Sequence, residues 1–236
     1  MRLIRVSRAL HPGLRRARPP PLDRLRRFRS TKGALLMKRL LLSLALLPGL
    51  ALAQASTWTI DPSHTHASFT VRHMVISSVR GEFGKTAGTV KLDEKDPTRS
   101  SVEAVIETAS VNTREQKRDD HLRSPDFFDA EKNPKITFRS TKVEKAGRGK
   151  LKVKGDLTMN GVTKPVVLDV EGPTPAIVDM QGNSRRGIAA RTTLNRKDFG
   201  LDWNKMVEAG PVVGDEVKVE IEAELVKQGP QTMDAG

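Results

Sequence analysis

The sequence predicts an all-β domain: an antiparallel β-barrel of about eight strands with one short helical insertion. Three observations support this fold class. Apolar and polar residues alternate with period two through most of residues 56–228, as they do in strands that bury one face. Turn residues separate these runs at the intervals typical of sandwiches and barrels. No helical pattern recurs between the strands, which disfavours a parallel βαβ sheet.

A β-sandwich satisfies the same alternation and stays open as an alternative. A barrel is favoured because closure removes the exposed edges that such long strands would otherwise present. An eight-stranded barrel is wide enough for packed side chains or for one slim ligand.

The strands can be placed from their alternation and from the turn residues between them. The last strand, 217–225, is the clearest example, with Val219 and Ile221 opposite charged neighbours. In chain order we expect strands at 58–60, ending at Asp61-Pro62-Ser63, and at 65–73, a glycine-marked bend at 79–84, strands at 86–92, 102–106, 136–139 and 150–157, a hairpin turn at Asn160-Gly161, and strands at 166–170, 188–194 and 217–225.

Residues 112–129 break this alternation, and we expect them to be helical. Thr113 and Gln116 have the spacing of a capping box, which predicts a helix start at Thr113. Ser124-Pro125 predicts the start of a second short turn, with Ser as N-cap and Pro at its first position. A helix that is polar nearly all round lies over another element, and here we expect it to cover one end or flank of the barrel.

The N-terminal part is expected to lie outside the folded domain. Residues 37–55 combine a positive start, an apolar run and small residues suited to cleavage near Ala53 or Ala55, which predicts a secretory signal peptide. Residues 1–36 are then expected to be an over-extended start or a disordered leader, with a basic binding arm as the alternative. Residues 229–236 are expected to form a flexible tail.

The basic composition belongs to this leader. Residues 1–39 hold 13 Lys and Arg and one acid, so residues 40–236 hold 28 bases and 27 acids, a net charge of +1 against +13 for the whole chain. A nucleic-acid partner is therefore not expected for the domain. The chain has no cysteine, which excludes disulfides and a lipidated N-terminal cysteine. We expect an exported protein located in the periplasm.

Several motifs, in this order, resemble the YceI-like family of polyisoprenoid-binding proteins over residues 57–228. They are Trp58-Thr59-Ile60-Asp61-Pro62-Ser63-His64-Thr65, Phe69-Thr70-Val71-Arg72-His73-Met74, Val79-Arg80-Gly81-Glu82-Phe83, residues 118–129, residues 155–163, residues 195–201 and Val213-Gly214-Asp215-Glu216-Val217. The resemblance implies a lipocalin-like barrel that holds a long isoprenoid chain or a similar lipid in an apolar interior. It implies no established enzymatic activity.

If a lipid is bound, the inward strand face and the helical stretch supply the candidate ligand residues. His73 either contacts the ligand head or is a buried histidine bonded to a neighbouring strand. His121 and Arg123 could bind a phosphate head, although ion pairs on a solvated helix face explain most charges here. The apolar candidates either touch the lipid or only fill the barrel end: Phe69, Val71, Phe83, Phe127, Phe128, Phe138, Phe199 and Trp203.

Other chemistry has little support in the sequence. His64 and His66 have a spacing that suits a metal, but two ligands are too few and no metal is expected. The chain has no cysteine, no Gly-x-Ser-x-Gly and no His-Glu-x-x-His, so an enzyme is not expected.

We therefore expect an exported protein that carries or stores a polyisoprenoid, with no cofactor other than a non-covalent polyisoprenoid or quinone-like lipid. Two alternatives stay open: an envelope stress or interaction protein with a filled barrel, and a quinone-binding redox partner. Transient contact with a membrane or a membrane redox protein, and a homodimer, are also left open.

Overall fold

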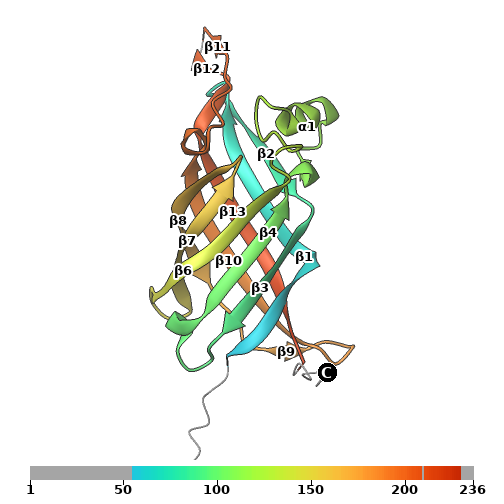
Figure 1. Cartoon of the computed structure of the whole chain (residues 1–236), viewed down its shortest axis with the longest axis vertical. Coiled ribbons are helices and arrows are strands. Elements are labelled where there is room, and N and C mark those ends of the chain that lie inside the picture. The colour runs from blue at the N-terminus through green and yellow to red at the C-terminus, as the bar shows by residue number, and fades with distance from the viewer. Residues whose placement is uncertain (1–54, 209, 230–236) are drawn as a thin grey trace, which may run out of the picture. The chain divides into compact units, whose positions relative to one another are not determined.

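The computed structural model describes residues 55–208 and 210–229. The predicted signal peptide, leader and C-terminal tail therefore lie outside the described residues, apart from Ala55 and Gly229. The described part of the chain folds into a closed antiparallel barrel with one short helix (Figure 1).

Eight strands form the closed wall, which confirms the predicted fold class and decides against the sandwich. Neighbouring strands follow one another along the chain, and β13 pairs with β1 to close the ring. The eight strands are β1 (Ser56–His73), β3 (Thr86–Leu92), β4 (Ser101–Glu107), β6 (Lys135–Lys145), β7 (Lys150–Met159), β8 (Val162–Glu171), β10 (Ser184–Asn195) and β13 (Val213–Lys227).

Shorter elements extend the wall and cover its two ends. Strand β2 (Ser77–Phe83) pairs with the second half of β1, and β5 (Val111–Asn112) pairs with β2. The expected bend at 79–84 is therefore wrong for residues 79–83, which continue the barrel wall as a strand, and only Gly84 lies in a bend. The other short elements are the 3₁₀ turns η1 (Pro97–Arg99), η2 (Thr108–Ser110) and η3 (Arg196–Phe199), and strands β9 (Ile177–Val178), β11 (Met206–Val207) and β12 (Gly210–Pro211).

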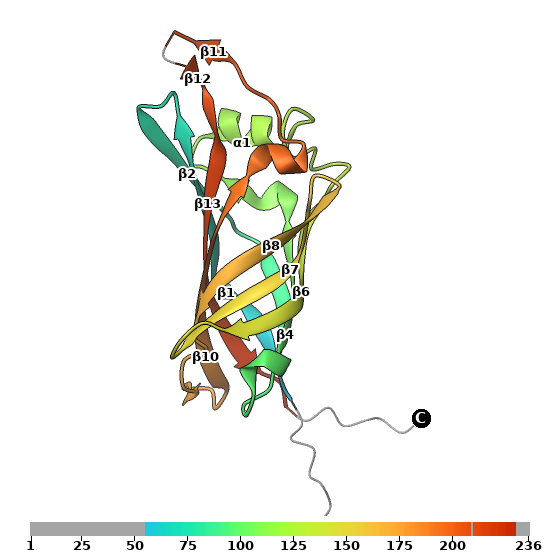
Figure 2. The same cartoon turned by 90° about the vertical axis from the view of Figure 1, so that its left-hand side faces the viewer.

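The two ends of the barrel carry different elements. Helix α1 (Gln116–Arg123) and the β11–β12 hairpin lie at one end, called the α1 end below (Figures 1 and 2). Strand β9 lies at the other end, called the β9 end (Figure 1). No helix among the described residues is long and apolar enough to cross a lipid bilayer.

Strand β1 does not end at Asp61, as the sequence predicts, but continues through a bulge. Ile60 pairs with Leu225 and Thr65 with Ala223, so four residues, 61–64, lie opposite Glu224 alone. Pro62 has no amide hydrogen to give to a ladder, and a bulge is where a strand tolerates proline. The bulge keeps Thr65, Ala67 and Phe69 in phase with β13, so one long strand serves the whole height of the wall.

Helix α1 begins three residues after the predicted start. Glu115 is the N-cap, and its carboxylate accepts hydrogen bonds from the amides of Lys117 and Arg118. Thr113 does not cap the helix, because its amide and its hydroxyl both donate to the buried carboxylate of Asp119. The predicted second helical turn at Ser124-Pro125 is a hydrogen-bonded turn rather than a helix.

Candidate functional site

The barrel interior contains an apolar cavity of about 210 Å3. About 10–15 Å3 of such space is enough for one water molecule, so the cavity can hold a chain of many atoms. Inward side chains from every strand of the wall line it. Representative lining residues are Ile60, Phe69, Phe138, Val153, Ile188 and Ile221.

Small residues on the inner face explain why the barrel is not filled by its own side chains. Ala67, Ala104, Ala190 and Ala223 all line the cavity. Gly155 lets the ring of Phe138 lie against the wall, since a Cβ at that position would stand 2.5 Å from the ring. The cavity therefore exists because alanine and glycine occupy inward positions of the strands.

Three aromatic rings close the α1 end of the cavity and are called the plug below: those of Phe83, Phe128 and Phe199. The centroid of the Phe83 ring lies 5.8 Å from that of Phe69 and 5.7 Å from that of Phe128, the latter in an edge-on arrangement. Phe199 belongs to the same cluster and is 2 % exposed. Edge-on and tilted pairs of this kind stabilise the packing beyond the area they bury.

A second aromatic group lies outside this plug. The rings of His121, Phe127 and Trp203 meet with centroid distances of 4.8–5.2 Å. The Nε2 atom of His121 lies 2.8 Å from Oδ2 of Asp126. The histidine therefore joins α1 to the turn that follows it and to the loop after η3.

Arg123 uses its guanidinium to attach α1 to the barrel. Its Nε donates to the carbonyl of Ala109 at 2.8 Å and its Nη2 to the carbonyl of Val111 at 2.8 Å. Its Nη1 lies 3.0 Å from Oδ1 of Asp120. These bonds hold the helix to the connection between β4 and β5.

The structure divides the eleven candidate ligand residues into four groups. Phe69, Phe83 and Phe138 line the cavity. Phe128 and Phe199 form the plug above it together with Phe83, and His121, Phe127 and Trp203 form the outer aromatic group. Val71, His73 and Arg123 are not among the lining residues. A ligand-binding role for any of these residues stays a prediction.

Sequence reasoning missed the residues at the β9 end. Trp58, only 1 % exposed, packs with Ile60 and Leu225 at that end of the cavity. Arg186 lies over the Trp58 ring, with its guanidinium carbon 5.2 Å from the ring centroid. The sequence predicted a strand that starts at residue 188, so Arg186 lay outside it. Arg186 nevertheless continues the inward alternation of Ile188 and Ala190.

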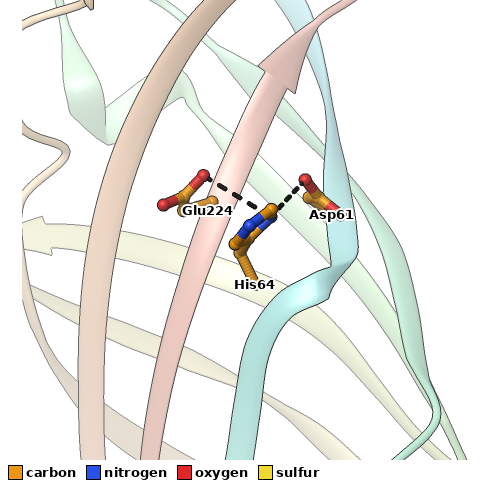
Figure 3. A group of neighbouring side chains, drawn as sticks. All are labelled: Asp61, His64 and Glu224. Atoms are coloured by element: carbon orange, nitrogen blue, oxygen red, sulfur yellow. Dashed lines mark hydrogen bonds and ion pairs between the residues drawn. The ribbon is translucent and has the colours of Figure 1, made fainter. Parts of the chain in front are cut away.

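Three side chains beside the β1 bulge have the composition of a metal site. Nδ1 of His64 lies 2.9 Å from Oδ2 of Asp61 and 4.0 Å from Oε2 of Glu224 (Figure 3). However, Nη1 of Arg185 contacts the same two carboxylates, at 2.6 and 2.9 Å. A guanidinium already supplies the positive charge here, so the cluster is an ion-pair network rather than a cation site. His66 is not part of it, because its ring faces Glu82.

This network lowers the pKa of its carboxyl groups. The Arg185 guanidinium, and after it His64, holds the pKa of Asp61 well below its usual range. Nε of Arg185 also bonds Oδ2 of Asp179 at 2.6 Å, and this bond lowers the pKa of Asp179 to about 2. Arg185 therefore ties the bulge of β1 to β13 and to the β9–β10 loop.

The chain is similar in sequence to a known protein family and to individual proteins. The family model for the YceI-like domain matches residues 58–225. A UPF0312 protein of Vibrio parahaemolyticus is 38 % identical over 194 residues, which cover 80 % of this chain and 97 % of that protein.

Solved structures agree in fold. The Campylobacter jejuni YceI protein is 31 % identical with a TM-score of 0.58, covering 67 % of this chain and 90 % of that one. A polyisoprenoid binding domain from Saccharophagus degradans is 14 % identical with a TM-score of 0.53, covering 74 % of this chain and all of that one. At that identity the second match shows the fold alone.

Arg185→Gln is expected to lower the melting temperature at pH 7, because it leaves three carboxylates without their cation. The loss should shrink on acidification. The folded-state pKa values of Asp61 and Asp179 are lowered, so their stabilisation is present above about pH 4 and is lost as the pH falls through about 2. Thermal unfolding at pH 7, 4 and 2 measures this. A gap to wild type that stays constant with pH would contradict the assignment.

Phe128→Ala is expected to reduce the free energy of unfolding by about 3–5 kcal/mol, because it leaves a void in the plug at the α1 end. Lys117→Ala on the exposed face of α1 is the matched control, with an expected change within about 0.5 kcal/mol. Urea unfolding followed by circular dichroism compares them. Similar losses in both variants would mean that the ring of Phe128 does not close the barrel.

Proposed function

Because the chain belongs to the YceI-like domain family, we propose that its barrel binds the apolar chain of a polyisoprenoid or a similar lipid. The observation that carries this proposal is the cavity of about 210 Å3, whose lining is formed by apolar side chains and a few serines and threonines. The fold shared with a polyisoprenoid binding domain supports it.

The energetics of such binding come from the hydrophobic effect. Each methylene that leaves water contributes about 0.8 kcal/mol. A preformed cavity adds to this, because the protein does not have to open a space at the moment of binding. The ligand class that this interior favours is therefore a long, slim, branched or unbranched hydrocarbon chain with a small polar group.

The cavity also helps to choose between the alternatives. An interaction protein whose barrel is filled by its own side chains would place larger residues at Ala104, Ala190 and Ala223, all of which line the space. A quinone shares the isoprenoid tail and fits the same interior. Proteins of the YceI-like family are in general binding proteins without a known catalytic activity.

The proposal includes export and lipid carriage or storage in the periplasm, which rests on the signal peptide expected at residues 37–55. A lipid with a long apolar chain is nearly insoluble, so carriage would require transient contact with a membrane at loading and release.

Native mass spectrometry of protein purified from its own periplasm tests lipid binding, and one lipid per chain is expected. Ala190→Phe should fill the cavity and remove the lipid, because Ala190 is 5 % exposed and lines the interior. Ala189→Phe is the matched control, since its neighbour across the strand is Glu222 and its side chain points outward. Equal lipid content in both variants, or no bound lipid in the wild-type protein, would contradict the proposal.

Export has its own test. Cell fractionation should recover the protein in the periplasm, and N-terminal sequencing should find a mature chain that starts at Gln54 or Ser56, after Ala53 or Ala55. Recovery of an unprocessed chain from the cytoplasm would contradict this part of the proposal and leave the lipid test unaffected.

A further inference from the structure

A positively charged side chain, that of Arg186, starts from the inner face of the barrel at the β9 end. Arg186 is the direct cross-strand partner of Leu225. Direct partners in an antiparallel pair project from the same face of the sheet. Leu225 lines the cavity, so the side chain of Arg186 also starts from the inner face. Arg186 lies two residues before Ile188 on β10, nearer the β9 end of the barrel.

The guanidinium of Arg186 lies across this end of the barrel. Its Nη2 bonds both carboxylate oxygens of Glu94, at 3.0 and 2.9 Å, and its Nη1 bonds the carbonyl of Thr174 at 3.0 Å. Glu94 follows β3 and Thr174 follows β8. With Trp58 beneath it, the side chain joins three segments of the rim where the apolar lining ends.

One donor of this guanidinium is left over. The Nε atom of Arg186 is buried and has no hydrogen-bond partner among the described residues. A buried donor without a partner destabilises the folded protein, so such groups are rare and call for an explanation. Arg186 is not itself a lining residue, but its cross-strand partner Leu225 and Pro173, the neighbour of Thr174, both line the cavity. The polar groups within the lining are the hydroxyls of serines and threonines, among them Oγ1 of Thr86, which has no hydrogen-bond partner in the described part of the chain, and none of them carries a charge.

The two cationic candidates at the α1 end, Arg123 and His121, offer no comparable donor. Arg123 already gives Nε, Nη1 and Nη2 to Ala109, Asp120 and Val111, and His121 is bonded to Asp126. The Phe83–Phe128 plug also separates these residues from the cavity. A head group bound at that end would have to displace existing hydrogen bonds.

The charge around Arg186 selects the kind of head group. Glu94 neutralises the guanidinium, because Nη2 of Arg186 donates to both of its carboxylate oxygens. A phosphate or diphosphate would have to compete with this carboxylate at close range. A neutral oxygen, such as that of a ketone, can accept the Nε hydrogen while the Glu94 pair stays in place.

We propose that Arg186 is the head-group site of the cavity and that it binds a neutral hydrogen-bond acceptor at the end of the lipid. This rests on the proposed function, because it assumes a chain in the barrel. The ligand then has one orientation, with its oxygen beside Trp58 and its tail directed toward Phe83 and Phe128.

The test compares two probes of equal chain length: geranylgeranylacetone, an isoprenoid ketone, and the corresponding hydrocarbon. Dissociation constants come from tryptophan fluorescence titrations. Wild type should bind the ketone about tenfold more tightly than the hydrocarbon, as expected for one hydrogen bond to a charged donor. Arg186→Lys should bring this ratio close to one, because lysine keeps the charge and the pair with Glu94 but has no Nε–H.

Arg191→Lys is the control. Arg191 lies on the same strand, faces outward and is paired with Glu220, so the ratio should stay near ten. Arg186→Lys with an unchanged ratio, or wild type that binds both probes equally, overturns the head-group site alone. Wild type that binds neither probe overturns the proposed function as well.

A second variant tests the same site without changing Arg186. Glu94→Gln removes the competing carboxylate, so geranylgeranyl diphosphate should bind about tenfold more tightly to this variant than to wild type. Circular dichroism establishes that the variants are folded. An affinity for the diphosphate that does not change in Glu94→Gln would place the head elsewhere and overturn the assignment.

Discussion

The pairing of β13 with β1 turns the sheet into a barrel. It closes the ring of eight strands, and closure leaves the wall without a free edge. Without it, the inward row of Val219, Ile221 and Ala223 would face solvent instead of a shared interior. The bulge at residues 61–64 belongs to the same constraint, because it keeps both halves of β1 in phase with β13. Arg185 fastens the bulge by bonding Asp61 and Glu224 on the two strands.

Once the wall is closed, the size of the inward side chains decides whether the barrel is filled or holds a cavity. Alanine and glycine at inward positions leave a cavity, whereas larger residues would have filled it. The two ends are closed by different chemistry. Phenylalanines on β2 and after α1 make the α1 end apolar, and Trp58 with Arg186 makes the β9 end partly polar. With the head-group site proposed at Arg186, this asymmetry would give a bound amphiphile one preferred direction in the barrel.

The sequence allowed the fold class and the position of the helix to be predicted, because alternation depends on each strand's own residues. It did not reveal the start of α1 or the continuity of β1. Thr113 looks like a helix cap, but Asp119 and Arg118 bind its polar groups in the folded chain. Asp61-Pro62 looks like the end of a strand, but its partner Arg185 lies 124 residues away. Tertiary contacts of this kind leave no local signal.

The candidate site was predictable to a similar degree. Phe69, Phe83 and Phe138 could be found because apolar residues on an inward face are expected to line the interior. Arg186 was missed because the predicted strand began at Ile188. Extending the alternation of Ile188 and Ala190 by one position would have marked Arg186 as inward, and its pairing with Leu225 agrees.

We propose that one apolar chain lies in the barrel between the Phe83–Phe128 plug and Arg186, and a crystal structure of the protein saturated with geranylgeranylacetone would test this. We expect continuous density along Phe138 and Ile221, ending in an oxygen within hydrogen-bond distance of Nε of Arg186. An empty cavity, or lipid density only on the outer surface, would show that the barrel does not hold the lipid.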